Sequence, residues 1–206
     1  MGLIIYFVAG RKDSAYINLT PRYACTNDCL FCDKKALEKS TENELYLDSA
    51  PSSEDVISDI RKKASGVKEF VFCGIGEPLL YLDKVLDITK HIKKEYGAKV
   101  RINTNGQAYL LYPKKDVIGL LERAGVDSLS ISLNVTNESD YNQLHRPRRK
   151  GAFGALLRFI KDSNASKIET VVSFVELPEL NKKAALEFTK SLGLKDSQVR
   201  FRKYLK

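Results

Sequence analysis

Three cysteines in a short segment carry the strongest chemical signal in the chain. Cys25, Cys29 and Cys32 have the spacing CxxxCxxC, which folds a short loop so that three thiolates converge. Thiolates are soft, strongly donating ligands that suit iron–sulfur clusters and zinc. Three ligands are one fewer than a closed tetrahedral site requires, so the pattern predicts a centre with one open coordination position.

A structural zinc site and disulfides are the alternative explanations of these cysteines. Zinc requires a fourth ligand, and the two histidines of the chain, His91 and His145, have no partner at the spacing of a zinc finger. Three clustered thiols cannot all pair, and nothing in the sequence marks the chain for export. An incompletely ligated metal or iron–sulfur centre is therefore the favoured interpretation.

Further motifs follow the cysteines, and with them the chain resembles the radical S-adenosylmethionine (SAM) superfamily over residues 14–204. Gly74–Pro78 resembles the GGEP motif of that family, and Asn103–Gly106 resembles the ending of its third strand. Ser132–Asn134 resembles the ending of its fourth strand, and Gln198–Tyr204 resembles its last strand. The first glycine of GGEP is Ile75 here, so that position must act through its backbone carbonyl. Two stretches, Tyr16–Thr20 and Phe72–Pro78, are most similar to the TatD-associated radical SAM proteins.

The resemblance implies both the cofactors and their contacts. The three cysteines would hold a [4Fe–4S] cluster whose fourth iron binds SAM, and an electron from a small flavodoxin- or ferredoxin-type protein would cleave SAM to a 5′-deoxyadenosyl radical. That radical would abstract hydrogen from a substrate. The expected SAM-binding residues are Phe31 beside the adenine, Gly74 and Gly76 at the methionine amine with Glu77 bracing their loop, Asn103 at the ribose, and Ser132 and Asn134 at the carboxylate or ribose.

Each of these contacts has a structural alternative. Phe31 would otherwise anchor its loop in the core, and Asn105-Gly106 would form an ordinary turn. Ser132 and Asn134 would otherwise belong to a hydrated wall, although buried polar groups need partners and a ligand supplies them.

Weaker candidates lie on other strands and loops. Ser173, Arg200 and Arg202 are candidate substrate or SAM contacts, because arginines hold a carboxylate or phosphate bidentately, and surface arginines are the alternative. Cys73 is either a small core residue or a hydrogen-atom donor to a substrate radical. The basic loop His145–Lys150 is either a solvated run or a grip for an anionic substrate or an RNA backbone.

Strand-like and helical segments alternate along the chain and predict an α/β fold. A hairpin of Leu3–Val8 and Ser14–Thr20 precedes six alternations of strand and helix. In Ser128–Asn134 the polar residues share one face and the apolar residues share the other, whereas a strand of an open doubly wound sheet should be apolar on both. We therefore expect a partial (βα)6 TIM-like barrel with an N-terminal β-hairpin extension and its site at the strand C-terminal ends.

The boundaries of the remaining elements follow from periodicity and capping residues. The predicted strands are Lys68–Cys73, Lys99–Asn103, Asp127–Asn134, Lys167–Glu176 and Gln198–Tyr204. The predicted helices are residues 52–64, Asp83–Glu95, Lys114–Ala124, Glu138–Leu144, Ala152–Asp162 and Asn181–Leu192. Lys34–Leu47 is charged, lacks a clean period and is expected to be a loop.

Length and composition set the class of the protein. A chain of 206 residues, 43% hydrophobic and 29% charged, predicts one soluble domain over residues 1–206. The net charge of +8 favours an anionic substrate, although many soluble proteins are as basic. Leu3–Val8 is too short to span a membrane or to form a signal peptide, so we expect no membrane contact and a cytoplasmic protein.

The identity of the substrate is left open by the sequence. Because the last predicted strand lies near the end of the chain, we expect a large substrate, a partner protein or a second copy in a homodimer to cover the barrel mouth. The candidate reactions are synthesis of a deazapurine-like heterocycle, activation of a glycyl-radical enzyme and modification of RNA. The alternative of a different class is a non-enzymatic metal-binding module.

Overall fold

The computed structural model describes residues 2–11, 13–34 and 44–204. Its centre is a seven-stranded sheet whose strands lie side by side in chain order. β1 and β2 form an antiparallel hairpin, and each later strand pairs parallel with the one before it. In the described residues β7 and β1 are the two edges, so the barrel is not closed. The strands are β1 Ile5–Tyr6, β2 Ser14–Ile17, β3 Glu69–Phe72, β4 Lys99–Thr104, β5 Ser128–Ser132, β6 Glu169–Glu176 and β7 Val199–Lys203.

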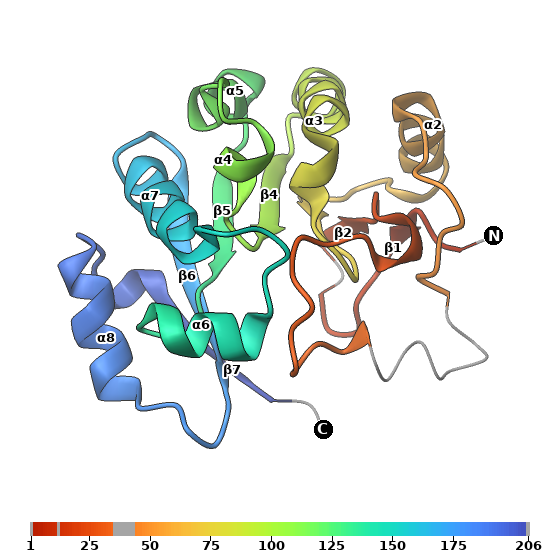
Figure 1. Cartoon of the computed structure of the whole chain (residues 1–206). Coiled ribbons are helices and arrows are strands. Elements are labelled where there is room, and N and C mark those ends of the chain that lie inside the picture. The colour runs from red at the N-terminus through yellow and green to blue at the C-terminus, as the bar shows by residue number, and fades with distance from the viewer. Residues whose placement is uncertain (1, 12, 35–43, 205–206) are drawn as a thin grey trace.

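The connecting helices lie on the outside of this sheet. Figure 1 shows α2, α3, α5, α7 and α8 following one another around it, whereas α6 lies at the strand ends beside the segment that carries the cysteines. The helices are α2 Ser53–Lys63, α3 Leu82–Tyr96, α4 Ala108–Leu111, α5 Val117–Ala124, α6 Glu138–His145, α7 Ala152–Asn164 and α8 Lys182–Ser191, with short 3-10 turns at Pro21–Tyr23, Pro78–Tyr81 and Asp196–Gln198. None of the described helices combines the length and the apolar character that a membrane span requires.

Local sequence signals explain where the first two helices begin and end. The Ser52 hydroxyl accepts the Asp55 N–H at 3.1 Å, and the Asp55 carboxylate accepts the Ser52 N–H at 3.0 Å. This capping box satisfies two main-chain donors at the start of α2. α3 buries a stripe that includes Val85, Ile88 and Ile92, and it ends at a left-handed Gly97. These boundaries confirm the sequence prediction to within a residue or two.

The alternation of β5 separates the core from the interior of the barrel. Leu129 and Ile131 are fully buried against the outer helices, whereas Ser128, Ser130 and Ser132 are half-buried on the opposite face. A single buried apolar cluster joins the outer face of the sheet to the helices. The prediction of a polar inner face is confirmed, and with it the partial (βα)6 barrel with its N-terminal hairpin.

Several boundaries differ from the sequence prediction for local reasons. The strand expected over Ser14–Thr20 ends at Ile17, because the Asn18 side chain accepts the Thr20 N–H at 3.2 Å and turns the chain. α5 begins at Val117 and not at Lys114, because the Asp116 carboxylate caps it by accepting the Gly119 N–H at 3.0 Å. The short helix α4 was not predicted. Of the expected loop over Lys34–Leu47, residues 35–43 lie outside the described part of the chain.

Candidate active site

A pocket of about 440 Å³ lies at the C-terminal ends of the strands. The segment of residues 25–32, called here the cysteine loop, forms one wall, and the Gly74–Glu77 loop after β3 forms another. The sequence candidates that line the pocket are Cys25, Cys29, Cys32, Phe31, Cys73, Gly74, Gly76, Glu77, Asn103, Ser132, Asn134, His145 and Arg202. Candidates that come from six separate segments of the chain thus meet around one space.

Main-chain hydrogen bonds hold the cysteine loop against a distant segment. The Asp28 N–H donates to the His145 carbonyl at 3.0 Å, and the Leu30 N–H donates to the Leu144 carbonyl at 2.9 Å. In the reverse direction the Arg148 N–H donates to the Thr26 carbonyl at 2.9 Å. The end of α6 and the start of the basic loop therefore fix the backbone from which the cysteines project.

Three buried polar side chains also hold the cysteine loop in place. The Gln107 amide donates to the Tyr141 hydroxyl at 2.9 Å and to the Asn27 side-chain oxygen, and the Asn27 amide reaches the Tyr141 hydroxyl at 3.4 Å. Both amide side chains and the tyrosine are at most 5% exposed. Buried hydrogen bonds of this kind specify one arrangement, so they fix the orientation of the cysteine loop.

The three cysteine thiols are half-buried and free of disulfides. Burial, and to a smaller degree the charge of Glu77, raises the pKa of the Cys25 thiol to about 11. Burial and the neighbouring Cys25 and Cys32 raise the pKa of Cys29, and burial raises that of Cys32. Buried thiols with raised pKa values ionise only beside a compensating cation, as in a metal centre.

The three thiols line one pocket but do not form a single tight shell around one ion. Among the described residues, no three histidine, cysteine, aspartate or glutamate side chains lie close enough to surround one ion. All three cysteines nevertheless line the same pocket, and the charges of Cys25 and Cys32 both act on Cys29.

His145 contacts the cysteines although it is remote from them in sequence. Its Nδ1 lies 3.6 Å from the Cys29 Sγ, and its ring stacks on Tyr141 and meets Phe31 edge to face. Burial lowers the pKa of His145 to about 4, so the imidazole is neutral near pH 7. His145 is remote from the cysteines in sequence and has no zinc-finger spacing to them, and the contact arises because the fold joins the end of α6 to the cysteine loop.

The glycine motif lies so close to its neighbours that side chains would not fit. A β-carbon at Gly76 would lie 2.5 Å from the Ala24 carbonyl oxygen, and one at Gly74 would lie 2.6 Å from the Asn18 Oδ1. Gly76 also has a φ of +155°, a conformation that favours glycine. The motif therefore brings bare backbone against the entrance of the cysteine loop.

Glu77 braces this loop, as the sequence suggested. It is 2% exposed, and its carboxylate accepts the Leu79 N–H at 3.0 Å, the Thr104 hydroxyl at 2.8 Å and the Asn105 N–H at 2.7 Å. Burial raises the pKa of Glu77 to about 7, and these hydrogen bonds oppose the rise. The carboxylate thereby ties the glycine motif to the end of β4.

Asn105 is a site residue that sequence reasoning missed. Its amide donates to the Thr26 hydroxyl at 2.8 Å and lies 3.6 Å from the Cys25 Sγ. Gly106 forms the expected turn, with a φ of +73°. The Asn-Gly pair signalled only a turn, and the contact with the cysteine loop depends on β4 ending opposite that loop.

On the inner wall, Asn103 lies between two partners. Its amide donates to the Cys73 Sγ at 3.2 Å, and its Oδ1 accepts from Arg101 at 3.0 Å. Arg101 in turn pairs with Glu69 through Nε to Oε1 at 3.0 Å and Nη2 to Oε2 at 3.1 Å. Cys73 thus belongs to a hydrogen-bonded wall and not to the apolar core.

The later strands contribute unequally. Asn134 lines the pocket and has a φ of +64°, and its Oδ1 accepts the Val175 N–H at 2.8 Å. Ser173 is 2% exposed and lies outside the pocket, with no partner for its hydroxyl among the described residues. Arg200 and Arg202 are both exposed, and only Arg202 lines the pocket, together with Lys203.

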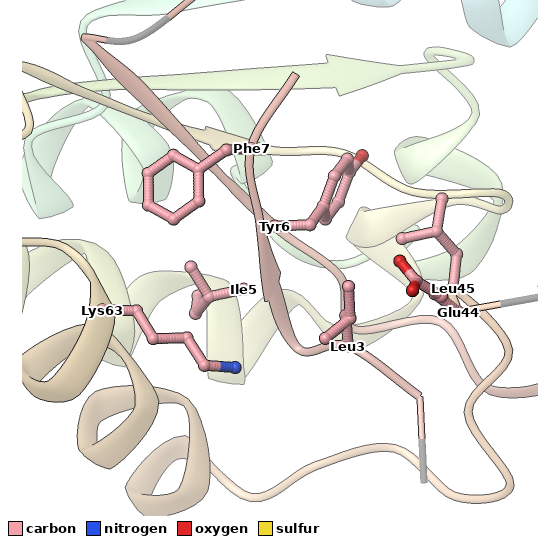
Figure 2. Close-up of a pocket in the computed structure, with 7 residues that line it drawn as sticks. All are labelled: Leu3, Ile5, Tyr6, Phe7, Glu44, Leu45 and Lys63. Atoms are coloured by element: carbon pink, nitrogen blue, oxygen red, sulfur yellow. The ribbon is translucent and has the colours of Figure 1, made fainter. Parts of the chain in front are cut away.

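A second hollow of about 440 Å³ lies at the β1 edge of the sheet. Figure 2 shows β1 crossing it, with Ile5 and Phe7 on one side and Tyr6 on the other. Its walls carry no thiol, so the chemistry of the motifs lies elsewhere. It is lined by Leu3, Ile5, Tyr6, Phe7, Glu44, Leu45 and Lys63.

Comparisons with known proteins agree with this geometry. The sequence model of the Radical SAM superfamily matches residues 19–192. The dual-specificity RNA methyltransferase RlmN of Buchnera aphidicola subsp. Acyrthosiphon pisum is 27% identical over 188 residues, which cover 82% of this chain and 48% of that protein. The chain thus spans about half the length of the curated relatives that it matches.

Solved structures show the same fold. Streptococcus suis SuiB bound to S-adenosylmethionine has a TM-score of 0.66 at 18% identity, over 89% of this chain and 39% of SuiB. TYW1 with a lysine-pyruvate adduct bound has a TM-score of 0.64 at 14% identity, over 94% of this chain and 65% of TYW1. Because the family match covers most of the chain, the protein belongs to the radical SAM superfamily, whose members are enzymes that use a [4Fe–4S] cluster and S-adenosylmethionine.

Proposed function

We propose that Cys25, Cys29 and Cys32 each bind one iron of the [4Fe–4S] cluster and that the pocket beside them holds SAM. The observation that carries this proposal is that three thiols with the spacing CxxxCxxC face one pocket, which the Gly74–Glu77 loop also lines. No fourth protein ligand is assigned, which leaves one iron for the amine and carboxylate of SAM.

The residues of the pocket fit such a cluster. The Asn27 N–H reaches the Cys25 Sγ at 3.4 Å and the Asn105 amide reaches it at 3.6 Å, so donors are in place to stabilise a ligated thiolate. Burial raises the pKa of all three thiols, so the positive charge of a bound metal centre would favour their thiolate forms. When bound, the cluster and SAM supply reductive cleavage to a 5′-deoxyadenosyl radical, which abstracts hydrogen from a substrate.

The chain's own residues would bind and orient SAM. The carbonyl groups around Gly74 and Gly76 would accept from the methionine amine, and Ser132 would donate to its carboxylate. Since the Asn134 Oδ1 already accepts from Val175, Asn134 would act through its amide N–H groups.

Asn103 and Phe31 already have protein partners that limit how each could contact SAM. Both ends of the Asn103 side chain are engaged, with Arg101 and with Cys73, so a ribose hydroxyl would share these groups and not meet a free amide. Phe31 is half-exposed and meets His145 at 5.2 Å between ring centroids, which leaves part of its ring for an adenine.

Anaerobic reconstitution with iron and sulfide tests the proposal. The reduced protein should release 5′-deoxyadenosine from SAM, and the variant Cys25→Ser should release none. Native protein that carries stoichiometric zinc and takes up no iron or sulfide would overturn the assignment. So would a reconstituted cluster that leaves SAM intact under strong reductant.

We further propose RNA as the substrate class, because exposed basic side chains adjoin the cysteine loop directly. Arg148 bonds through its N–H to Thr26, and its side chain and that of Lys150 are exposed. RlmN, with which the chain shares limited identity, is an RNA methyltransferase. Phosphate contacts make binding salt-dependent, so each contact removed should lower the salt slope by about 1 or a little less.

A gel-shift titration at several salt concentrations tests this substrate class. Replacement of Arg148 and Lys150 by glutamine should weaken RNA binding and flatten its salt dependence. Replacement of Lys62 and Lys90, which are exposed on outer helices, removes the same charge and should change binding much less. Equal losses in the two double variants would point to net charge alone.

Other features of the proposal follow from the family resemblance and from the length and composition of the chain. We place the protein among the TatD-associated radical SAM proteins on Tyr16–Thr20 and Phe72–Pro78, with one core domain over residues 1–206 in the cytoplasm. A small flavodoxin- or ferredoxin-type protein would supply the electron. A partner, a second copy or the substrate itself would cover the pocket mouth and shield the radical from water.

A further inference from the structure

Within the described part of the chain, His145 is the buried side chain through which α6 contacts a cysteine of the CxxxCxxC motif. It is the last residue of α6 and is 1% exposed, and its Nδ1 lies 3.6 Å from the Cys29 Sγ. Its own carbonyl accepts the Asp28 N–H at 3.0 Å, so backbone and side chain both contact the cysteine loop. Sulfur is larger than oxygen, and 3.6 Å is a hydrogen-bond length for a nitrogen donor to a sulfur acceptor.

The position of the ring proton follows from its surroundings. The Nε2 atom is buried and has no partner among the described residues. A proton on Nε2 would leave a buried donor unsatisfied, whereas a proton on Nδ1 is donated to the Cys29 sulfur. The neutral ring therefore carries its proton on Nδ1 when Cys29 is a thiolate.

Packing holds the ring in the orientation that this bond requires. The imidazole stacks on Tyr141 with 4.3 Å between centroids and 16° between planes. On the other side Phe31 meets it edge to face at 5.2 Å. Tyr141 is itself fixed by its hydrogen bonds to Gln107 and Asn27, so the donor is preorganised before any cofactor binds.

We propose that His145 is a positioning residue that donates its Nδ1–H to the Cys29 ligand and thereby makes the cluster easier to reduce. The inference rests on the proposed function, because it requires Cys29 to bind the cluster. Reduction adds one negative charge to the cluster and its thiolates, and a donor aimed at a sulfur stabilises the reduced form more than the oxidised form. The contact between His145 and Cys29 arises from the position of α6 in the fold, and none of the sequence motifs described above includes it.

The small number of histidines makes a direct measurement feasible in the native protein. Histidine is present only at His91 and His145, so protein grown with nitrogen-15 histidine carries label at two positions. Pulsed electron paramagnetic resonance of the reduced cluster should detect coupling to a histidine nitrogen and to its exchangeable proton. The coupling should persist in His91→Phe and vanish in His145→Phe. A reduced cluster without histidine coupling in the native protein overturns the proposal.

Redox titration of the reconstituted protein gives a second readout. His145→Phe keeps an aromatic ring between Tyr141 and Phe31 but removes the donor, and His145→Asn restores an N–H near the same sulfur. At the native midpoint, His145→Phe should hold about tenfold less reduced cluster relative to oxidised cluster, a negative shift of about 59 mV for one electron. His145→Asn and His91→Phe should remain near the native midpoint.

The outcomes distinguish a failure of the proposed role of His145 from a failure of the proposed function. If the native protein binds no iron and sulfide, the proposed function fails and this inference fails with it. If the native cluster forms and cleaves SAM, but His145→Phe has the native midpoint with a full complement of iron, only the role of His145 is overturned. If His145→Phe does not fold, the labelling experiment on native protein decides.

Discussion

Replacing Glu77 by glutamine should change how the stability of the protein depends on pH. The carboxyl of Glu77 is buried, and burial raises its pKa from an ordinary value of 4.5 to about 7 in the folded chain. A carboxyl with a raised pKa in the folded state binds more protons there than in the unfolded state. Its contribution to stability is therefore full below about pH 4.5 and is lost as the pH rises through about 7.

The magnitude follows from the two pKa values. One pKa unit is worth about 1.4 kcal/mol, so the native protein should lose about 3 kcal/mol through this group between about pH 4 and about pH 8. Glutamine does not titrate. It also places an amide nitrogen opposite one of the main-chain N–H donors, from Leu79 or Asn105, that the carboxylate satisfies. That unsatisfied donor should cost about 1–3 kcal/mol at every pH.

Urea unfolding of cofactor-free, reduced protein, followed by circular dichroism, measures both effects. At about pH 5 the variant Glu77→Gln should be less stable than the native protein by about 1–3 kcal/mol. By about pH 8 the gap should close or reverse, because only the native protein has lost stability through this group. Other titrating groups are common to both proteins and cancel in the difference. Parallel curves for the two proteins across this range would refute the reasoning.

The remaining predictions concern the cysteines and the glycine loop. After reconstitution, Cys25→Ser should lose most bound iron and sulfide, whereas Cys73→Ser should keep both. Metal and sulfide analysis measures this difference, and equal loss in the two variants would contradict the ligand assignment. Gly76→Ala should destabilise the protein by about 2 kcal/mol or more in urea unfolding, because its β-carbon would lie 2.5 Å from the Ala24 carbonyl oxygen. Gly66→Ala, at a φ of +74° with open space around it, should cost only about 1 kcal/mol.

The parts of the structure that the sequence predicted are those with local causes. The capping box at Ser52, the Gly97 helix end and the alternation in β5 each depend on residues a few positions apart. The inner polar face of β5 was enough to favour a half-barrel over a doubly wound sheet, because burial on two faces and burial on one require different patterns.

The parts that the sequence did not predict depend on where separate segments meet. Asn105 and His145 contact the cysteine loop, yet each is surrounded in sequence by ordinary turn or helix signals. Conversely, Ser173 and Arg200 share the expected strand faces but lie outside the pocket, because strand periodicity fixes the face of a side chain and not its height along the barrel.

The hydrogen bonds between residues 26–30 and 144–148 have a consequence for biosynthesis. The cysteines leave the ribosome early, but the backbone that holds them pairs with a segment made much later. Until residue 148 has emerged and α6 has folded, these main-chain hydrogen bonds are missing, and among the described residues the loop is held by its contacts with Glu77, Asn105 and Gln107. We therefore expect that assembly factors which deliver iron and sulfide act on this protein only after most of it has been translated.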